Sequence, residues 1–229
     1  MSLHLSQTFT EGTRRVFTQT GGILFVLLLS IQILIQTSIN TVISDIFPRE
    51  VTEQLGGMLG LTLPVSATVA GALLALGFVL SSAYFVVVAR ALTRPKNQLS
   101  SFPKSVYTRR IGRATLSMIG GSILVIISIM IGTILFILPG FFLAICFLFF
   151  IFAVGLEDRR ALDALRYSWD LSRGNRLKLF VLVVFAGVIG ILVAIVGSVF
   201  DLANAPVAAE LTSNTLSSVL MIFLYGFLS

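Results

Sequence analysis

Six long apolar segments, separated by shorter polar ones, dominate the pattern along the chain. A helix needs about 20 apolar residues to cross a bilayer, because it rises only 1.5 Å per residue. A transmembrane barrel is excluded, since its strands would alternate apolar and polar residues in short segments. The pattern predicts an all-α polytopic membrane helical bundle, one integral membrane domain over residues 1–229. The six predicted transmembrane helices cover residues 21–43, 64–89, 114–138, 140–156, 179–200 and 211–228.

Composition agrees with this pattern. Hydrophobic residues make up 56% of the chain and charged residues only 11%, with a mean hydropathy of +1.01. Soluble domains carry about 25% charged residues, and a chain of this size could not bury so much apolar surface in water. Disorder, a disulfide scaffold and a soluble enzyme are thereby excluded. The single cysteine, Cys146, lies in an apolar segment and reads as a small buried hydrophobe.

The basic residues predict the orientation. Fifteen of the sixteen Lys and Arg residues precede the first segment or lie between segments two and three or four and five, and Arg49 alone falls on the other side. Basic residues near span ends remain cytoplasmic. Both termini are therefore expected inside (N-in/C-in). With the acidic residues included, the inner face carries +10 and the outer face −4.

Two amphipathic helices are predicted along the cytoplasmic surface, at residues 2–17 and 157–173. In the second, apolar residues recur at helical spacing, and charged residues on the other face form i,i+4 pairs. Gly174 and Asn175 then favour a helix end. The predicted pairs are Arg159–Asp163 and Arg166–Asp170. On the outer side, residues 45–63 are read as a short surface helix, with a re-entrant segment as the alternative.

Residues that could carry chemistry are scarce. The only histidine is His4, no metal-ligand spacing occurs within a span, and the predicted spans contain no ionisable side chain deep in the membrane. The chain is therefore expected to be no enzyme and to need no metal or cofactor. A cluster of four carboxylates offers a divalent-ion site as an alternative, but the arginines among them favour a salt-bridged helix. These carboxylates are Glu157, Asp158, Asp163 and Asp170.

One polar stripe runs along the first span, where Gln32, Gln36 and Asn40 recur every four residues and share a helix face. These amides either line a polar cavity or substrate path, or hydrogen-bond to neighbouring helices. The second interpretation is preferred, because membrane amides commonly join helices in this way.

The basic inner face also has two interpretations. Clustered Arg and Lys residues beside spans attract anionic headgroups, yet most of them simply enforce orientation. We hypothesise that two clusters, one ahead of the third span and one ahead of the fifth, converge on a lipid headgroup. The clusters are Arg109, Arg110 and Arg113, and Arg173, Arg176 and Lys178.

Residues 137–180 contain several short motifs: Pro139-Gly140, Glu157-Asp158, Ala161, Ala164-Leu165, Leu171, and an interfacial motif of Ser168-Trp169 with Arg173-Gly174-Asn175. With these motifs the segment resembles a known family, the membrane domain found with some glycerophosphoryl diester phosphodiesterases and related six-helix membrane proteins. The resemblance implies no catalytic residue, because the hydrolase activity of such proteins belongs to a separate soluble barrel.

Together these features predict a non-enzymatic, multi-pass protein of the cytoplasmic (inner) membrane that interacts with lipid or a protein partner at its inner face. The alternative is a small transporter or flippase-like carrier that uses the polar stripe. Membrane lipids are the expected partners and nucleic acid is not one, since a net charge of +6 is small and sits beside the spans. Oligomeric state stays open.

Overall fold

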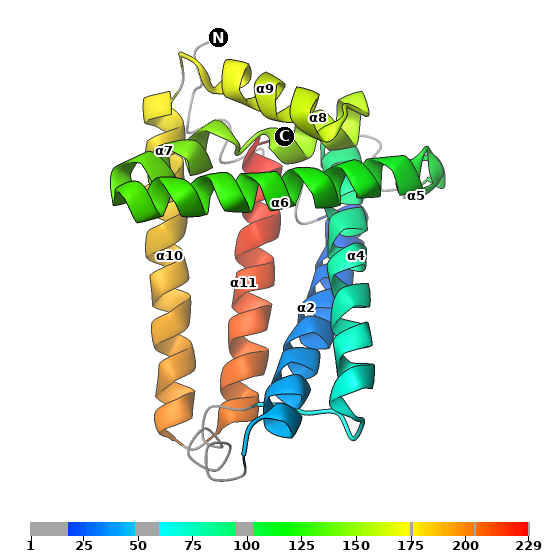
Figure 1. Ribbon diagram of the computed structural model, residues 1–229, viewed down its shortest axis with the longest axis vertical. Helices are drawn as coiled ribbons and strands as arrows, with labels where there is room; N and C mark the ends of the chain where they lie inside the picture. Colours follow the sequence, from blue (N-terminus) through cyan, green and yellow to red (C-terminus); the bar gives the residue numbers. More distant parts are fainter. Residues whose placement is uncertain (1–17, 49–59, 95–102, 175, 204, 229) are drawn as a thin grey trace. The chain divides into compact units, whose positions relative to one another are not determined.

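The computed structural model describes residues 18–48, 60–94, 103–174, 176–203 and 205–228, and every regular element in these ranges is a helix (Figure 1). The all-α fold class is thereby confirmed. The predicted surface helix at 2–17 and most of residues 45–63 lie outside the described residues. The helices are α2 (Gln19–Ile46), α4 (Ala67–Leu92), α5 (Ser105–Thr108), α6 (Ile111–Leu135), α7 (Ile137–Cys146), α8 (Phe150–Glu157), α9 (Ala161–Ser172), α10 (Arg176–Leu202) and α11 (Pro206–Leu228).

Five stretches of the described chain are long and apolar enough to cross a membrane, and they carry many exposed aliphatic side chains. Such surfaces suit lipid rather than water. The chain is therefore a membrane protein with five candidate spans. The sixth predicted span falls in α11, which is not among them. The five are Gln19–Ile46, Ala67–Leu92, Ile111–Leu135, Leu138–Glu157 and Arg176–Phe200.

The chain divides into two compact units. Unit 1 is built mainly from residues 82–186, and unit 2 from residues 23–81 and 187–222. Because the boundaries fall inside α2, α4, α10 and α11, these four long helices contribute residues to both units.

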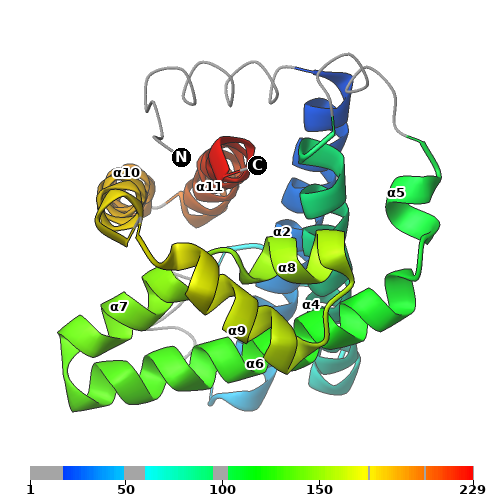
Figure 2. The same cartoon turned by 90° about the horizontal axis from the view of Figure 1, so that it is seen from above.

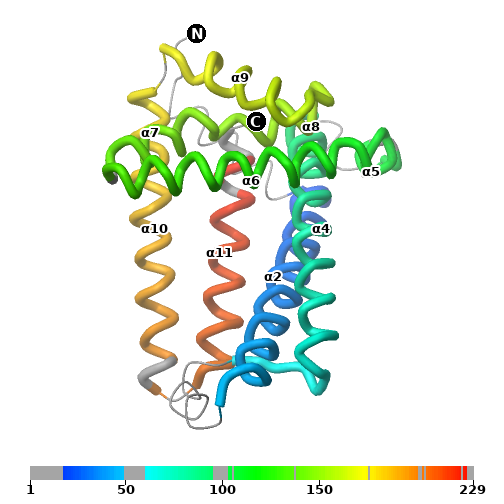
Figure 3. The backbone as a smooth tube through the Cα atoms, viewed as in Figure 1, coloured from blue at the N-terminus to red at the C-terminus, as the bar shows by residue number. Residues whose placement is uncertain are grey.

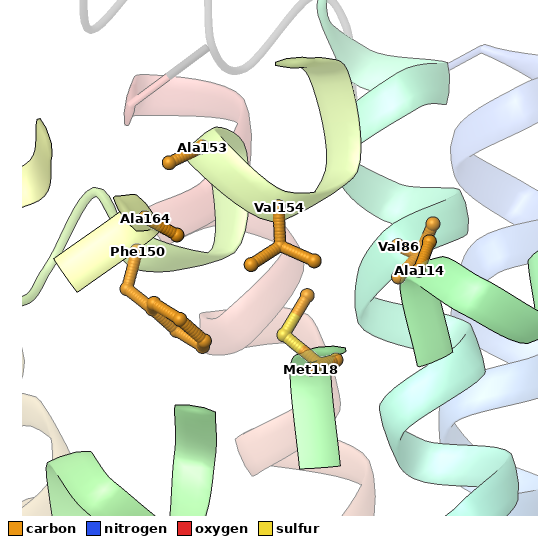
Figure 4. Packing of buried hydrophobic residues seen from close by; sticks show 7 residues of the cluster. All are labelled: Val86, Ala114, Met118, Phe150, Ala153, Val154 and Ala164. Carbon is orange, nitrogen blue, oxygen red and sulfur yellow. The ribbon is translucent and has the colours of Figure 1, made fainter. Parts of the chain in front are cut away.

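The core of unit 1 joins α4, α6, α8 and α9 through small and medium-sized side chains (Figure 4). A side chain on Gly121 would overlap the ring of Phe150, so glycine here allows α6 and α8 to approach closely. The buried residues of this core are Val86, Ala114, Met118, Phe150, Ala153, Val154 and Ala164.

The fourth predicted span, 140–156, is interrupted rather than continuous. α7 ends at Cys146 and α8 begins at Phe150. In an unbroken helix the Phe150 amide would donate to the Cys146 carbonyl, but here it donates to Phe147 instead. The fully buried Ser168 of α9 donates its hydroxyl hydrogen to the Cys146 carbonyl at 2.8 Å. α9 thus satisfies a backbone group that the break would leave unpaired.

The predicted surface helix over 157–173 starts later than expected, so its first bound needs correction. Glu157 ends α8, Asp158 adopts the left-handed conformation with φ 50°, and α9 starts only at Ala161. The predicted i,i+4 pairing of Arg159 with Asp163 fails because Arg159 precedes the helix. Arg159 pairs with Glu157 instead.

Asp158 turns here because it is held by two arginines. The Arg90 side chain, only 9% exposed, bonds Asp158 at 2.8 Å, and Arg109 approaches the other carboxylate oxygen at 3.3 Å. The same guanidinium of Arg90 donates to the carbonyl oxygens of Gly155 (2.7 Å) and Arg109 (2.6 Å). Arg90 therefore ties the end of α4 to the end of α8 and to the residue that precedes α6 by two positions.

Within unit 1, α6 runs across the C-terminal part of α4 rather than alongside it (Figures 1 and 2). Two candidate spans therefore do not run parallel in this unit. The predicted count of six spans is not confirmed, and the N-in/C-in orientation stays a prediction.

Unit 2 contains the parts of α2, α4, α10 and α11 that fall within residues 23–81 and 187–222, and these helices can be followed in Figure 3. Small residues bring these helices close. A side chain on Gly77 of α4 would contact Ile35 of α2 at 2.7 Å, and one on Gly197 of α10 would contact Ser213 of α11 at 2.5 Å. This unit carries the polar stripe of the first span.

We expect Ser168→Ala to lower the free energy of unfolding by about 1–3 kcal/mol, because it leaves the buried Cys146 carbonyl without a donor. Thermal unfolding in one detergent would measure the change. Ser128→Ala is the matched control, since that hydroxyl bonds the Leu124 carbonyl of its own helix. Equal stability of the two variants would contradict this account of the helix break.

Candidate functional site

The polar groups of unit 2 meet around one carboxylate, that of Glu210 in α11. Its Oε2 atom accepts hydrogen bonds from the Asn40 side chain at 3.2 Å and from the Leu61 amide at 2.9 Å. Asn40 also donates to the Leu61 carbonyl at 3.1 Å. A side chain on Gly60 would overlap the Glu210 carboxylate, which shows how tightly this segment packs against it. Three parts of unit 2 are thus joined at Glu210.

The segment ahead of α4 is fixed by two more side chains of α2. Thr41, which is buried, accepts a hydrogen bond from the Leu63 amide at 2.7 Å. Asp45 accepts one from the Ala67 amide, the first of α4, at 2.7 Å. A carboxylate at a helix start is favourable because it caps free amides and offsets the helix dipole. Side-chain hydrogen bonds from α2 therefore fix the backbone of the segment that leads into α4.

A cavity of about 290 Å³ lies beside this network. That volume is near the lower end of the range for small-molecule pockets. Its wall combines amides, hydroxyls and one carboxylate with small side chains that leave room for a ligand. The lining residues are Gln36, Ala194, Gly197, Ser198, Pro206, Ala209, Glu210, Ser213 and Asn214.

Two buried polar atoms of the cavity residues lack a hydrogen-bond partner in the described part of the chain. They are Oε1 of Glu210, an acceptor, and Nδ2 of Asn214, a donor. The two residues are four apart in α11 and so lie on one helix face. Buried polar groups are nearly always paired, so each such atom needs an explanation. Both residues line the cavity, and each has one buried polar atom to which the described residues offer no partner.

Two residues of the polar stripe hydrogen-bond to a neighbouring helix, and the third lines the cavity. Gln32 accepts a hydrogen bond from Ser218 of α11 at 2.8 Å, and Asn40 bonds Glu210, so both amides join α2 to α11. Gln36 lines the cavity and donates to Asn40 at 3.3 Å. Whether the stripe also serves a solute stays a prediction.

Sequence reasoning missed Glu210. Because the sixth span was predicted to start at Leu211, Glu210 was expected on the outer surface. In the structure α11 begins at Pro206 and includes Glu210. A signal was present: Pro206 suits the first turn of a helix, and Glu210 and Asn214 then repeat the four-residue spacing seen in the first span.

The basic residues predicted to bind a headgroup all belong to unit 1. Arg109 pairs with Asp158, and the exposed Arg110 caps α6 in the left-handed conformation with φ 43°. Arg113 is exposed. In the second cluster, Arg173 lies 3.6 Å from Asp170. That contact takes the place of the predicted pairing of Asp170 with Arg166.

The rest of the second cluster surrounds the interfacial motif. Arg176 lies over the rings of Phe142 and Trp169, and Lys178 is exposed. Gly174 has φ 83° and follows the end of α9, as the sequence predicts, while Asn175 lies outside the described residues.

Next to the motif, the guanidinium of Arg159 lies 4.1 Å from the centre of the Tyr167 ring. A hydrogen bond with Glu157 raises the pKa of Tyr167 above its ordinary value. Arg159, Glu157 and Tyr167 thus contact one another.

A family model described as a domain of unknown function (DUF7847) matches residues 3–228. No curated protein and no solved structure matches the chain. Nothing in these findings links the chain to glycerophosphoryl diester phosphodiesterase, so that resemblance has no support from them.

We expect Asn40→Leu to destabilise the protein more than Gln32→Leu. The first change removes the donor to both Glu210 and the Leu61 carbonyl, at a cost of about 2–3 kcal/mol. The second leaves Ser218 free to bond a carbonyl of its own helix and costs at most about 1 kcal/mol. Thermal unfolding of both variants in the same detergent tests the order, and the reverse order would refute the central place of Asn40.

Proposed function

The chain belongs to the DUF7847 family of domains of unknown function, and we propose that it binds a small, positively charged polar solute in the cavity of unit 2. The observation that carries this proposal is the unpartnered oxygen of Glu210 beside the cavity. A carboxylate in apolar surroundings is costly unless a donor or a cation meets it. Asn40 and the Leu61 amide meet one of its oxygens. A bound cation would meet the other.

The wall of the cavity favours a compact solute that can both donate and accept hydrogen bonds. An ammonium group would donate to Glu210, and an oxygen on the same solute would accept from Asn214. Gln36, Ser198 and Ser213 supply further groups of either kind. A primary alkylammonium with a hydroxyl or carbonyl is the chemical class that uses these groups best.

Because the proposed site lies among apolar helices, the role that follows is that of a carrier for such a solute across the membrane. This is the alternative function that the polar stripe predicts, and the cavity beside Gln36 is what now favours it. On this proposal the chain is a binding protein rather than an enzyme. The competing role, interaction with lipid, is supported by a different set of contacts in unit 1.

We expect ethanolammonium to raise the unfolding temperature of the purified protein in a saturable manner, because a ligand that binds only the folded state stabilises it. Glu210→Gln should weaken this binding at least tenfold, since it removes the charge and replaces one acceptor oxygen. Calorimetric titration gives the affinities directly. Uptake of labelled ethanolammonium into proteoliposomes then distinguishes a carrier from a protein that only binds.

Asp170→Asn is the matched control, because it removes a carboxylate that is exposed and lies in unit 1. Its affinity should equal that of the unchanged protein. Gln36→Leu, which alters the cavity wall and leaves the Glu210 contacts in place, covers the case in which Glu210→Gln does not fold. Equal affinity for the unchanged protein and both cavity variants, or no saturable binding of ethanolammonium, would refute the proposal.

A further inference from the structure

A second polar group without a hydrogen-bond partner lies in unit 1, at the first residue of α10. The guanidinium carbon of Arg176 is 4.7 Å from the ring centre of Phe142 and 4.9 Å from that of Trp169. Its Nε and Nη2 atoms are buried and make no hydrogen bond within the described residues. The aromatic rings compensate part of the positive charge. They offer the N–H groups no oxygen to bind.

The surroundings of Arg176 combine apolar surface with positive charge. Leu177 is 77% exposed, and Phe180, exposed as well, stacks edge-to-face on Phe141 at 5.7 Å. Arg173 and Lys178 are both exposed beside these apolar residues. Aromatic and basic residues next to exposed aliphatic ones are typical of the level where lipid headgroups meet acyl chains.

We propose that Arg176 binds the phosphate of an anionic phospholipid, with the acyl chains along the exposed face of Leu177 and Phe180. A phosphate oxygen supplies an acceptor for this guanidinium, which presents its N–H groups in a plane that suits phosphate. Arg173 and Lys178 add favourable charge at the rim. The proposal concerns unit 1 alone and stands independently of the cavity around Glu210.

The molecule contains its own reporter for this site. Trp169 is the single tryptophan of the chain, and it contacts both Arg176 and Phe142, whose ring centre is 5.6 Å from its own. Its fluorescence therefore comes from the proposed site and from nowhere else in the chain. Lipids that carry bromine on their acyl chains quench tryptophan on contact, so quenching measures which lipid occupies the site.

The experiment reconstitutes the full chain in vesicles and compares quenching of Trp169 by brominated phosphatidylglycerol and brominated phosphatidylcholine. We expect phosphatidylglycerol to be preferred about fivefold, since one basic residue near a membrane surface contributes about 1 kcal/mol toward an anionic lipid. Arg176→Gln should clearly lower the preference, although Arg173 and Lys178 still contribute positive charge. Arg166→Gln, which removes the same charge from an exposed position on the helix of Trp169, should keep it.

Two further arms make each outcome decisive. If Arg176→Gln does not fold, Arg176→Lys carries the test, because lysine keeps the charge but loses the planar donors, and its preference should fall. Adding inorganic phosphate distinguishes the lipid from a free ion, which should not relieve quenching by phosphatidylglycerol. An equal response to both lipids, an unchanged preference in the Arg176 variant, or full relief by inorganic phosphate would overturn the proposal.

Discussion

The constraint on which this structure depends is that apolar surroundings leave no backbone polar group unpaired without a large cost. Interrupted helices create such groups, and the structure pairs them with a few side chains. Ser168 reaches across from α9 to the Cys146 carbonyl at the end of α7. Arg90 bonds the Gly155 carbonyl and holds Asp158 in the turn that follows α8. These polar contacts allow a sequence with so few charged residues to contain broken helices.

The same constraint organises unit 2, where the irregular segment ahead of α4 must pair its backbone with helix side chains. Asn40 and Glu210 bond both backbone groups of Leu61, and Thr41 bonds the amide of Leu63. A polar residue in an apolar helix therefore has a structural role here before any functional one. Asn40 and Gln32 accordingly join α2 to α11, and Gln36 between them lines the cavity.

Helix positions were largely predictable from the sequence, because length and hydropathy decide whether a segment is an apolar helix. Hydropathy is insensitive to single polar contacts, and the errors follow from this. The break at Asp158 depends on Arg90, which is 68 residues away in sequence and has no local signature. Glu210 appeared to lie outside a span because a charge normally ends one. Its hydrogen bond with Asn40, 170 residues away in sequence, has no local signature either.

The buried polar side-chain atoms that lack a hydrogen-bond partner are the most informative about function. Within the described residues they are the hydroxyl of Tyr84 and atoms of Arg176, Glu210 and Asn214. A tyrosine hydroxyl is neutral and costs little when it is left alone, compared with an ionic group. Arg176 and Glu210 are the ionic members, of opposite sign and in different units. A fold that supplies partners even to single backbone carbonyls would be expected to pair these charges as well, unless ligands of opposite charge do so. The two proposals therefore rest on the same physical argument but assign separate ligands, an anionic lipid to Arg176 and a cationic solute to Glu210.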